Sequence, residues 1–219
     1  MPAVVNSEPS DGVWTIIVAG GSGERFGSLK QFETVAGRHV IDWSIGVAST
    51  VGRVVAVVPA ACDGEVTGAT TTVVGGSTRS GSVRCGLAAV PDDAEVVLVH
   101  DGARPLADET LFHRVVAAVR AGAVAVVPVV PVTDTLRSRA DGSVVDRDGL
   151  AAVQTPQGFD AAVLRAAHDR GGDATDDAAL AQLEGYAITL VAGDPDNLKI
   201  TTPHDLVVAT ALLEHRRRS

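Results

Sequence analysis

A glycine-rich segment at residues 19–31, A-G-G-S-G-E-R-F-G-S-L-K-Q, carries the residue types best suited to chemistry in this 219-residue chain. It follows an apolar run, residues 13–18, that is typical of a buried strand. Glycines let the backbone come close to a ligand, and free N–H groups in such a loop can hold phosphate oxygens. Arg25 and Lys30 add two cations beside it. The segment therefore indicates a site for a nucleoside triphosphate.

Two other phosphate-binding motifs do not fit the spacing of this loop. A dinucleotide-binding loop needs G-x-G-x-x-G, but Phe26 stands at the third glycine position counted from Gly21 and Gly23. A P-loop needs a glycine followed by lysine and then serine or threonine, and no glycine in this chain precedes a lysine. A flexible loop with scattered charges remains the alternative to a triphosphate site.

Charged side chains follow the carboxyl ends of several predicted strands. Because those ends meet along one edge of a parallel sheet, we expect these side chains to lie together. The set consists of Arg25, Lys30, Arg79, Asp101, Arg104 and Lys199. No Ser-His-Asp, Cys-His or paired-carboxylate arrangement stands out. Phosphoryl and nucleotidyl transfer mainly needs positioning and cations that match charge on the phosphorus oxygens, so the set favours such a transfer.

The alternation of predicted elements indicates an α/β fold. Strands are expected over residues 13–18, 53–59, 70–74, 95–99, 123–130 and 187–191. Helices are expected over residues 40–51, 77–90, 108–121, 161–168, 177–183 and 203–216. This order predicts a mostly parallel sheet with helices on both faces, in a single domain that spans residues 1–219.

Composition and charge narrow the possible partners and location. A hydrophobic content of 46% with only 3% aromatic residues suits parallel strands buried on both faces. The net charge of -9 argues against nucleic-acid binding, and no apolar stretch is long enough to span a membrane. Residues 1–11 lack the features of a secretory signal and are expected to form a disordered tail. Cys62 and Cys85 show no metal or redox spacing, so we expect a cytoplasmic protein.

The alternation stops at Pro131, and the following segment is polar with turn signals at residues 140–142 and 148–149. The flanks 133–137 and 143–145 could pair as a β-hairpin. A projecting hairpin is only marginally stable and usually needs a partner surface. We therefore expect residues 131–155 to form a dimerisation arm, with a long mobile loop as the alternative.

Eight motifs in order give the chain a resemblance to a known family. They are A-G-G-S-G-E-R-F-G…K-Q, G-G-S-T-R-S-G-S-V, V-H-D-G-A-R-P, P-V-T-D-T, V-D-R-D-G-L, Q-T-P-Q-G-F, A-T-D-D and D-N-L-K-I-T. Through them the chain resembles the 2-C-methyl-D-erythritol 4-phosphate cytidylyltransferase family of the non-mevalonate isoprenoid pathway. The resemblance implies a Rossmann-like nucleotidyltransferase domain and a homodimer formed through the arm. It also implies that CTP and methylerythritol phosphate react, with Mg²⁺ as cofactor, to give the CDP-alcohol and pyrophosphate.

The resemblance also implies roles for individual residues. Arg25 and Lys30 would stabilise the transition state, while Lys199, with Arg147 from the arm of the other subunit, would position the methylerythritol phosphate. The nucleotide would be held by Ala19, Gly20, Gly21, Gly23, Gly76, Arg79 and Ser82. The pocket for the second substrate would contain Asp101, Arg104, Thr135, Thr155 and Asp196. The phosphates of CTP are expected to supply most of the Mg²⁺ ligands.

Four positions depart from the usual family pattern, namely Gly20, Leu29, Ser77 and Gly102, and none of them removes a cation. Three other functions stay open. The first is a cytidylyltransferase for another polyol phosphate, such as ribitol 5-phosphate. The second is a glycosyltransferase of the GT-A type, which would need a D-x-D motif where this chain has D-G-A. The third is a catalytically silent nucleotide-binding module, which predicts the loss of one or more of the cations.

Overall fold

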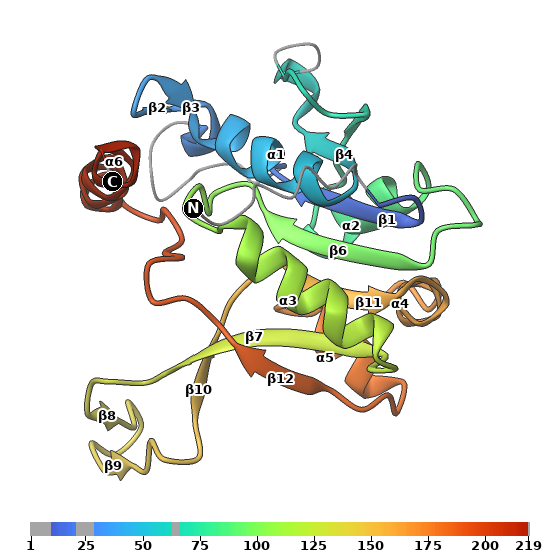
Figure 1. Cartoon of the computed structure of the whole chain (residues 1–219). Helices are drawn as coiled ribbons and strands as arrows, with labels where there is room; N and C mark the ends of the chain where they lie inside the picture. The colour runs from blue at the N-terminus through green and yellow to red at the C-terminus, as the bar shows by residue number, and fades with distance from the viewer. Residues whose placement is uncertain (1–9, 21–28, 63–65, 219) are drawn as a thin grey trace, which may run out of the picture.

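The computed structural model describes residues 10–20, 29–62 and 66–218. Within them, an eight-stranded sheet follows the order β10-β7-β11-β6-β1-β4-β5, and β12 also pairs with β7 (Figure 1). The strands are β1 (Val13–Val18), β4 (Arg53–Val58), β5 (Thr71–Val74), β6 (Val96–Asp101), β7 (Ala125–Pro131), β10 (Ala151–Val153), β11 (Gln157–Asp160) and β12 (Thr189–Ala192). Strands β10 and β11 run antiparallel to their neighbours, whereas the others run in one common direction. The predicted mostly parallel α/β sheet is confirmed.

Helices cover both faces of this sheet (Figure 1). Their bounds are α1 (Val40–Val51), α2 (Arg79–Leu87), α3 (Glu109–Arg120), α4 (Ala161–Asp169), α5 (Asp177–Leu183) and α6 (Pro203–Arg218). Neighbouring side chains of β1 point to opposite faces, so that Ile16 belongs to the core cluster with residues of α2, α4 and α5, and Ile17 belongs to the cluster with residues of α1 and α3. Helix α6 packs in a third cluster with Val35 and Ile200. None of the helices in the described chain has the length and apolar character needed to cross a membrane.

Polar residues fix where the helices of the site begin. The side chain of Thr78 accepts a hydrogen bond from the Gly81 N–H at the start of α2. Asp176 does the same for the Ala179 N–H at the start of α5. Such caps satisfy backbone donors that have no partner inside the helix, and each contributes about 1 kcal/mol.

The arm contains the predicted hairpin. Strand β8 (Leu136–Arg137) pairs antiparallel with β9 (Val144–Val145), and Gly142 takes the positive φ of 75° that the turn requires. The hairpin projects away from the sheet (Figure 1). Residues 151–153 return to the sheet as β10, so the projecting part is shorter than the expected span 131–155.

Several elements differ from the sequence-based expectation. Strands β10 and β11 were not predicted, nor was the small hairpin of β2 (Thr34–Val35) and β3 (Arg38–His39). The short strand β11 has little apolar character of its own and is buried because β6 and β7 flank it. Of the expected tail, residues 1–9 lie outside the described residues, while the Ser10 N–H donates to the Val51 carbonyl oxygen (3.2 Å).

Candidate active site

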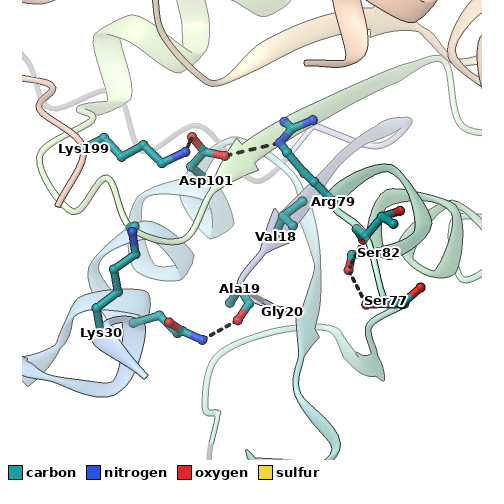
Figure 2. A pocket seen from close by; sticks show the side chains of 13 residues that line it. Val18, Ala19, Gly20, Lys30, Ser77, Arg79, Ser82, Asp101 and Lys199 are labelled. Atoms are coloured by element: carbon teal, nitrogen blue, oxygen red, sulfur yellow. Dashed lines mark hydrogen bonds and ion pairs between the residues drawn. The ribbon is translucent and has the colours of Figure 1, made fainter. Parts of the chain in front are cut away.

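A cavity of about 530 Å³ opens where the strands β1, β5 and β6 end. The register pairs Val18 with Asp101, so the segment after β1 lies beside the end of β6. In Figure 2 the side chains of Lys30, Arg79 and Lys199 surround this space. The cavity is lined by Val18, Ala19, Gly20, Lys30, Gln31, Gly76, Ser77, Thr78, Arg79, Ser82, Asp101, Ala103 and Lys199. Four members of the predicted set of charged residues therefore lie together at this edge.

The glycine-rich segment is described only at its two ends. Arg25, Gly21 and Gly23 lie outside the described residues. Lys30 belongs to a short 3-10 helix, Lys30–Phe32, and lines the cavity. Next to it, the side-chain Nε2 of Gln31 donates to the Ala19 carbonyl oxygen, which connects the two ends of the segment.

Gly20, Gly76 and Ser82 line the part of the larger cavity between the segment after β1 and the start of α2, which we call the slot. A Cβ atom on Gly76 would lie 2.8 Å from the carbonyl carbon of Gly81, so this position requires glycine. The Ser82 hydroxyl is bonded to the carbonyl oxygens of Thr78 (2.9 Å) and Gly76 (3.3 Å). Glycine backbone therefore faces the cavity at this point, and it allows the close approach that a nucleotide base would need.

A second cavity, of about 300 Å³, adjoins the first. It is lined by Arg79, Asp101, Arg104, Val153, Gln154, Thr155, Gln157, Thr175, Asp176 and Lys199. Arg79, Asp101 and Lys199 line both cavities. Two ligands bound side by side would therefore meet at these three side chains.

Asp101 is the centre of the charged cluster. Its Oδ2 lies 2.8 Å from Nζ of Lys199 and 3.5 Å from Nε of Arg104. Its Oδ1 lies 3.8 Å from Nε of Arg79. Burial opposes ionisation of this carboxyl, but Lys199, Arg79 and Arg104 outweigh burial and lower its pKa below the ordinary value. The cluster thus carries a net positive charge that suits phosphate oxygens.

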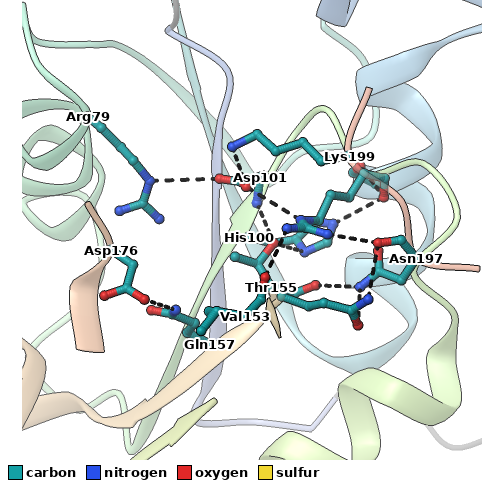
Figure 3. Close-up of polar contacts among 12 residues, drawn as sticks. Arg79, His100, Asp101, Val153, Thr155, Gln157, Asp176, Asn197 and Lys199 are labelled. Atoms are coloured by element: carbon teal, nitrogen blue, oxygen red, sulfur yellow. Dashed lines mark hydrogen bonds and ion pairs between the residues drawn. The ribbon is translucent and has the colours of Figure 1, made fainter. Parts of the chain in front are cut away.

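A buried polar scaffold supports this cluster from the side of the second cavity (Figure 3). Thr155 accepts a hydrogen bond from the Asp101 N–H (3.0 Å) and lies 3.1 Å from Nδ1 of His100. Burial lowers the pKa of His100 to about 4, so its imidazole is neutral near pH 7. Arg104 donates to the Asn197 carbonyl oxygen (2.8 Å), and Asn197 donates to that of Thr155 (2.9 Å). The contacts connect the end of β6 to the segment that carries Lys199.

Three predicted substrate residues lie away from both cavities of this chain. Thr135 and Arg147 are exposed residues of the arm, and the Arg147 guanidinium donates to the Thr133 carbonyl oxygen. Asp196 pairs with Arg216 of α6 (3.4 Å) instead of facing a cavity. Arg104 and Thr155, in contrast, line the smaller cavity as expected.

The donor set at the site suits a metal that arrives with a ligand. The described residues contain no group of three or more His, Cys, Asp and Glu side chains that could hold a metal ion. Among the described lining residues of the larger cavity, Asp101 is the sole carboxylate, and it faces Lys199, Arg104 and Arg79. Mg²⁺ commonly binds through substrate phosphates, waters and one or two carboxylates. These residues therefore fit a Mg²⁺ ion held mainly by a triphosphate.

Some residues of the site were not found from the sequence. Asp177 is buried beneath Arg79, and Gln157 and Asp176 line the smaller cavity. The A-T-D-D motif indicates only a helix start, and Gln157 follows a proline without any pattern of its own. Their contribution depends on how distant segments pack together.

The fold and the site together define a nucleotidyltransferase of the α/β class. The family model for IspD, 2-C-methyl-D-erythritol 4-phosphate cytidylyltransferase, matches residues 13–215. A relative with this name from Nocardia farcinica is 43% identical over 228 residues, which cover 97% of this chain and 99% of the relative. A second one, from Rhodococcus opacus, is 44% identical over 216 residues, which cover 92% of this chain and 95% of the relative. The crystal structure of the Thermus thermophilus cytidylyltransferase has a TM-score of 0.82 and 38% identity, covering 92% of this chain and 98% of that one. The chain belongs to the 2-C-methyl-D-erythritol 4-phosphate cytidylyltransferase family.

Proposed function

We propose that the protein transfers the cytidylyl group of CTP to 2-C-methyl-D-erythritol 4-phosphate. An oxygen of the substrate's phosphate forms a bond to the α-phosphorus of CTP, and the bond from that phosphorus to the pyrophosphate oxygen breaks. The products are 4-diphosphocytidyl-2-C-methyl-D-erythritol and pyrophosphate. The observation that carries this proposal is the pair of adjoining cavities that share Arg79, Asp101 and Lys199. CTP occupies the larger cavity and the polyol phosphate the smaller one.

The cations act mainly by positioning the reactants and by matching charge. Lys30, together with Arg25, stabilises the charge that develops on the α-phosphate oxygens during the in-line displacement. Lys199 lines both cavities and orients the attacking phosphate. Asp101 keeps the Lys199 ammonium in place through their 2.8 Å contact.

A Mg²⁺ ion completes the site in this proposal. Bound to the triphosphate, it would neutralise charge on the phosphate oxygens. Among the described residues that line the larger cavity, Asp101 is the carboxylate that could bind the metal ion. The cations around Asp101 compete with a metal for its oxygens. The triphosphate therefore supplies most of the ligands.

The active unit in this proposal is a homodimer joined through the arm. Exposed apolar side chains gather there, including Val144 (60% exposed), Val153 (46%) and Leu150 (43%). A partner surface would remove these side chains from water. The partner's arm would also bring Arg147 and Thr135 to the smaller cavity, which on its own chain they do not line.

We further propose that the enzyme works in the cytoplasm on small molecules and binds neither nucleic acid nor membrane. The net charge of -9 supports this, because a polyanion such as DNA would be repelled by most of the surface. The cations that a phosphate needs are instead concentrated at the site.

Substrate selectivity tests the proposal. Pyrophosphate release is measured with Mg²⁺ and CTP in the presence of methylerythritol phosphate or ribitol 5-phosphate, and with ATP or UTP in place of CTP. We expect release only with CTP and methylerythritol phosphate. Release with ribitol 5-phosphate alone would keep the mechanism but assign another polyol, and no release with any pair would indicate a silent nucleotide-binding module.

A further inference from the structure

A buried carboxylate lies directly beneath the active-site cluster. Asp177 has no exposed side-chain surface, and its Oδ2 lies 2.8 Å from Nη1 of Arg79. Its Oδ1 lies 3.0 Å from Nε2 of His168, whose side chain is only 2% exposed. A charge buried this deeply is strongly unfavourable unless partners of this kind compensate it. Arg79 and His168 therefore belong to one unit with Asp177.

Asp177 is not needed to start its helix. The capping role belongs to Asp176, which accepts the Ala179 N–H (2.8 Å). Asp176 also accepts a hydrogen bond from the side chain of Gln157 (2.9 Å), and Gln157 accepts the Ala178 N–H (3.2 Å). The first turn of α5 is thus fixed to strand β11, and the Asp177 carboxylate has a fixed position under Arg79.

Arg79 connects this buried unit to both cavities. It is the first residue of α2, lines both cavities and points toward Asp101 from the side opposite Lys199 (Figure 3). Its contact with Asp177 (2.8 Å) is shorter than its contact with Asp101 (3.8 Å). Burial opposes the charged form of Arg79, but Asp177 and Asp101 outweigh burial and raise its pKa. The guanidinium is therefore charged and anchored on the side away from the ligands.

We propose that Asp177, supported by His168, is a positioning residue that holds Arg79 at the boundary between the two cavities, where the α-phosphate of CTP meets the attacking phosphate. The inference rests on the proposed function and extends the role of Arg79 from nucleotide binding to the transfer step. A long side chain that is ordered before the substrates arrive does not have to be immobilised at each turnover. Asp177 and His168 supply this order from outside the ligand space.

Kinetics of Asp177→Asn in the full-length chain test this inference. Asparagine keeps the size of the side chain but removes the charge that fixes the guanidinium. We expect kcat/KM for pyrophosphate release to fall by about 10- to 100-fold, mainly through kcat, because a misplacement of about 1 Å in a catalytic group has effects of this size. The matched control is Glu184→Gln, which removes another carboxylate–arginine pair at the end of α5 (Arg170, 3.2 Å) away from the cavities and should keep wild-type kinetics.

A double-variant cycle separates positioning from general stability. If Asp177 acts through Arg79, Asp177→Asn should add little to the loss caused by Arg79→Gln, since interacting residues are not additive. Losses that multiply, or a folded Asp177→Asn protein with wild-type kcat/KM, would overturn the inference. If Asp177→Asn does not fold, His168→Leu tests the inference in its place. We expect its kcat/KM to fall by about 2- to 10-fold, which is the effect of losing one hydrogen bond. Unchanged kinetics in a folded His168→Leu protein would equally overturn the inference.

A readout without turnover keeps the two proposals distinguishable. The Nε–H group of Arg79 should give a distinct side-chain NMR signal in the wild-type protein that shifts when CTP is added. In Asp177→Asn this signal should broaden or vanish, while Glu184→Gln leaves it unchanged. An ordered Arg79 signal in Asp177→Asn contradicts the inference even if the wild-type protein releases no pyrophosphate, which would contradict only the proposed function.

Discussion

The ammonium of Lys199 lies 2.8 Å from the carboxylate of Asp101, at the boundary between the two cavities. Lys199 comes from the segment after β12, whereas Asp101 ends β6, so the contact joins distant parts of the chain. The ion pair holds the cation in place before a phosphate arrives. Arg79 and Arg104 face the same carboxylate, so three cations surround Asp101 and the cluster has more positive than negative groups.

Lys30→Ala should affect turnover more than CTP binding. The Lys30 side chain lines the larger cavity, where we place the triphosphate, and its charge matters most as negative charge develops in the transition state. We expect kcat to fall by a factor on the order of 100 or more, about 3 kcal/mol in the barrier. Steady-state kinetics together with calorimetric CTP binding check this. Arg120→Ala, on the exposed end of α3, is the control, and an unchanged kcat for Lys30→Ala would remove Lys30 from the mechanism.

Gly76→Ala should damage the nucleotide slot. The added Cβ would lie 2.8 Å from the carbonyl carbon of Gly81, so the start of α2 has to shift. We expect a loss of stability of about 1–3 kcal/mol and a weaker affinity for CTP, measured by urea unfolding and calorimetry. Gly172→Ala is the control, because its Cβ would make only an ordinary contact of 3.7 Å with Leu180. Equal CTP affinity in the two variants would mean that no base enters the slot.

The neutral His100 predicts a specific dependence of stability on pH. Its pKa is about 4 in the folded protein, against an ordinary value of about 6.5. Between these two pH values, His100 is protonated in the unfolded chain but neutral in the folded protein. The free energy of unfolding therefore falls as the pH drops through this window. From pH 7 to pH 5, His100 lowers the free energy of unfolding by about 2 kcal/mol. Asp101 adds little slope here, because above about pH 5 it is ionised in the unfolded chain, with an ordinary pKa of about 3.9, and also in the folded protein, where its pKa is lower still.

Urea unfolding at pH 7 and pH 5 checks this pH dependence. The wild-type protein should lose more stability over this range than a folded His100→Asn variant, which has no imidazole to protonate. The same loss in both proteins would show that other groups cause the acid sensitivity.

Mixed dimers test the role of the arm. If Arg147 acts in the partner's site, a heterodimer of an Arg147→Ala chain and a Lys30→Ala chain contains one site with both residues intact. We expect up to about half of the wild-type activity per dimer to return, since one of the two sites is restored. No recovery in purified heterodimers would mean that each arm serves its own subunit.

Part of the fold was predictable from local patterns. Strand β1 and helix α1 have the bounds that their apolar spacing predicts, Val13–Val18 and Val40–Val51. Strand β11 was missed because pairing with β6 and β7, not its own sequence, makes it a strand. Gly158 within it allows α3 to approach, since a Cβ there would lie 2.4 Å from Val115. Such a requirement is visible only once the elements are packed.

The site was predictable to the extent that strand ends determine it. Asp101, Arg79 and Lys199 lie together because parallel strands end at one edge. The role of Asp177 was not predictable, because an aspartate in the first turn of a helix gives the same sequence pattern whether or not it pairs with a distant arginine. The arm residues Arg147 and Thr135 line neither cavity of this chain, and the place that we propose for them in a partner's site cannot be predicted from the pattern of one chain.

Transfer of the α-phosphate tests the central claim most directly. The protein is incubated with Mg²⁺, methylerythritol phosphate and CTP labelled at the α-phosphorus. The labelled products are then separated and identified by mass spectrometry. We predict that the label appears in 4-diphosphocytidyl-2-C-methyl-D-erythritol, with one pyrophosphate released per product. Label that stays in CTP, or that is released as CMP without a CDP-alcohol, would contradict cytidylyl transfer.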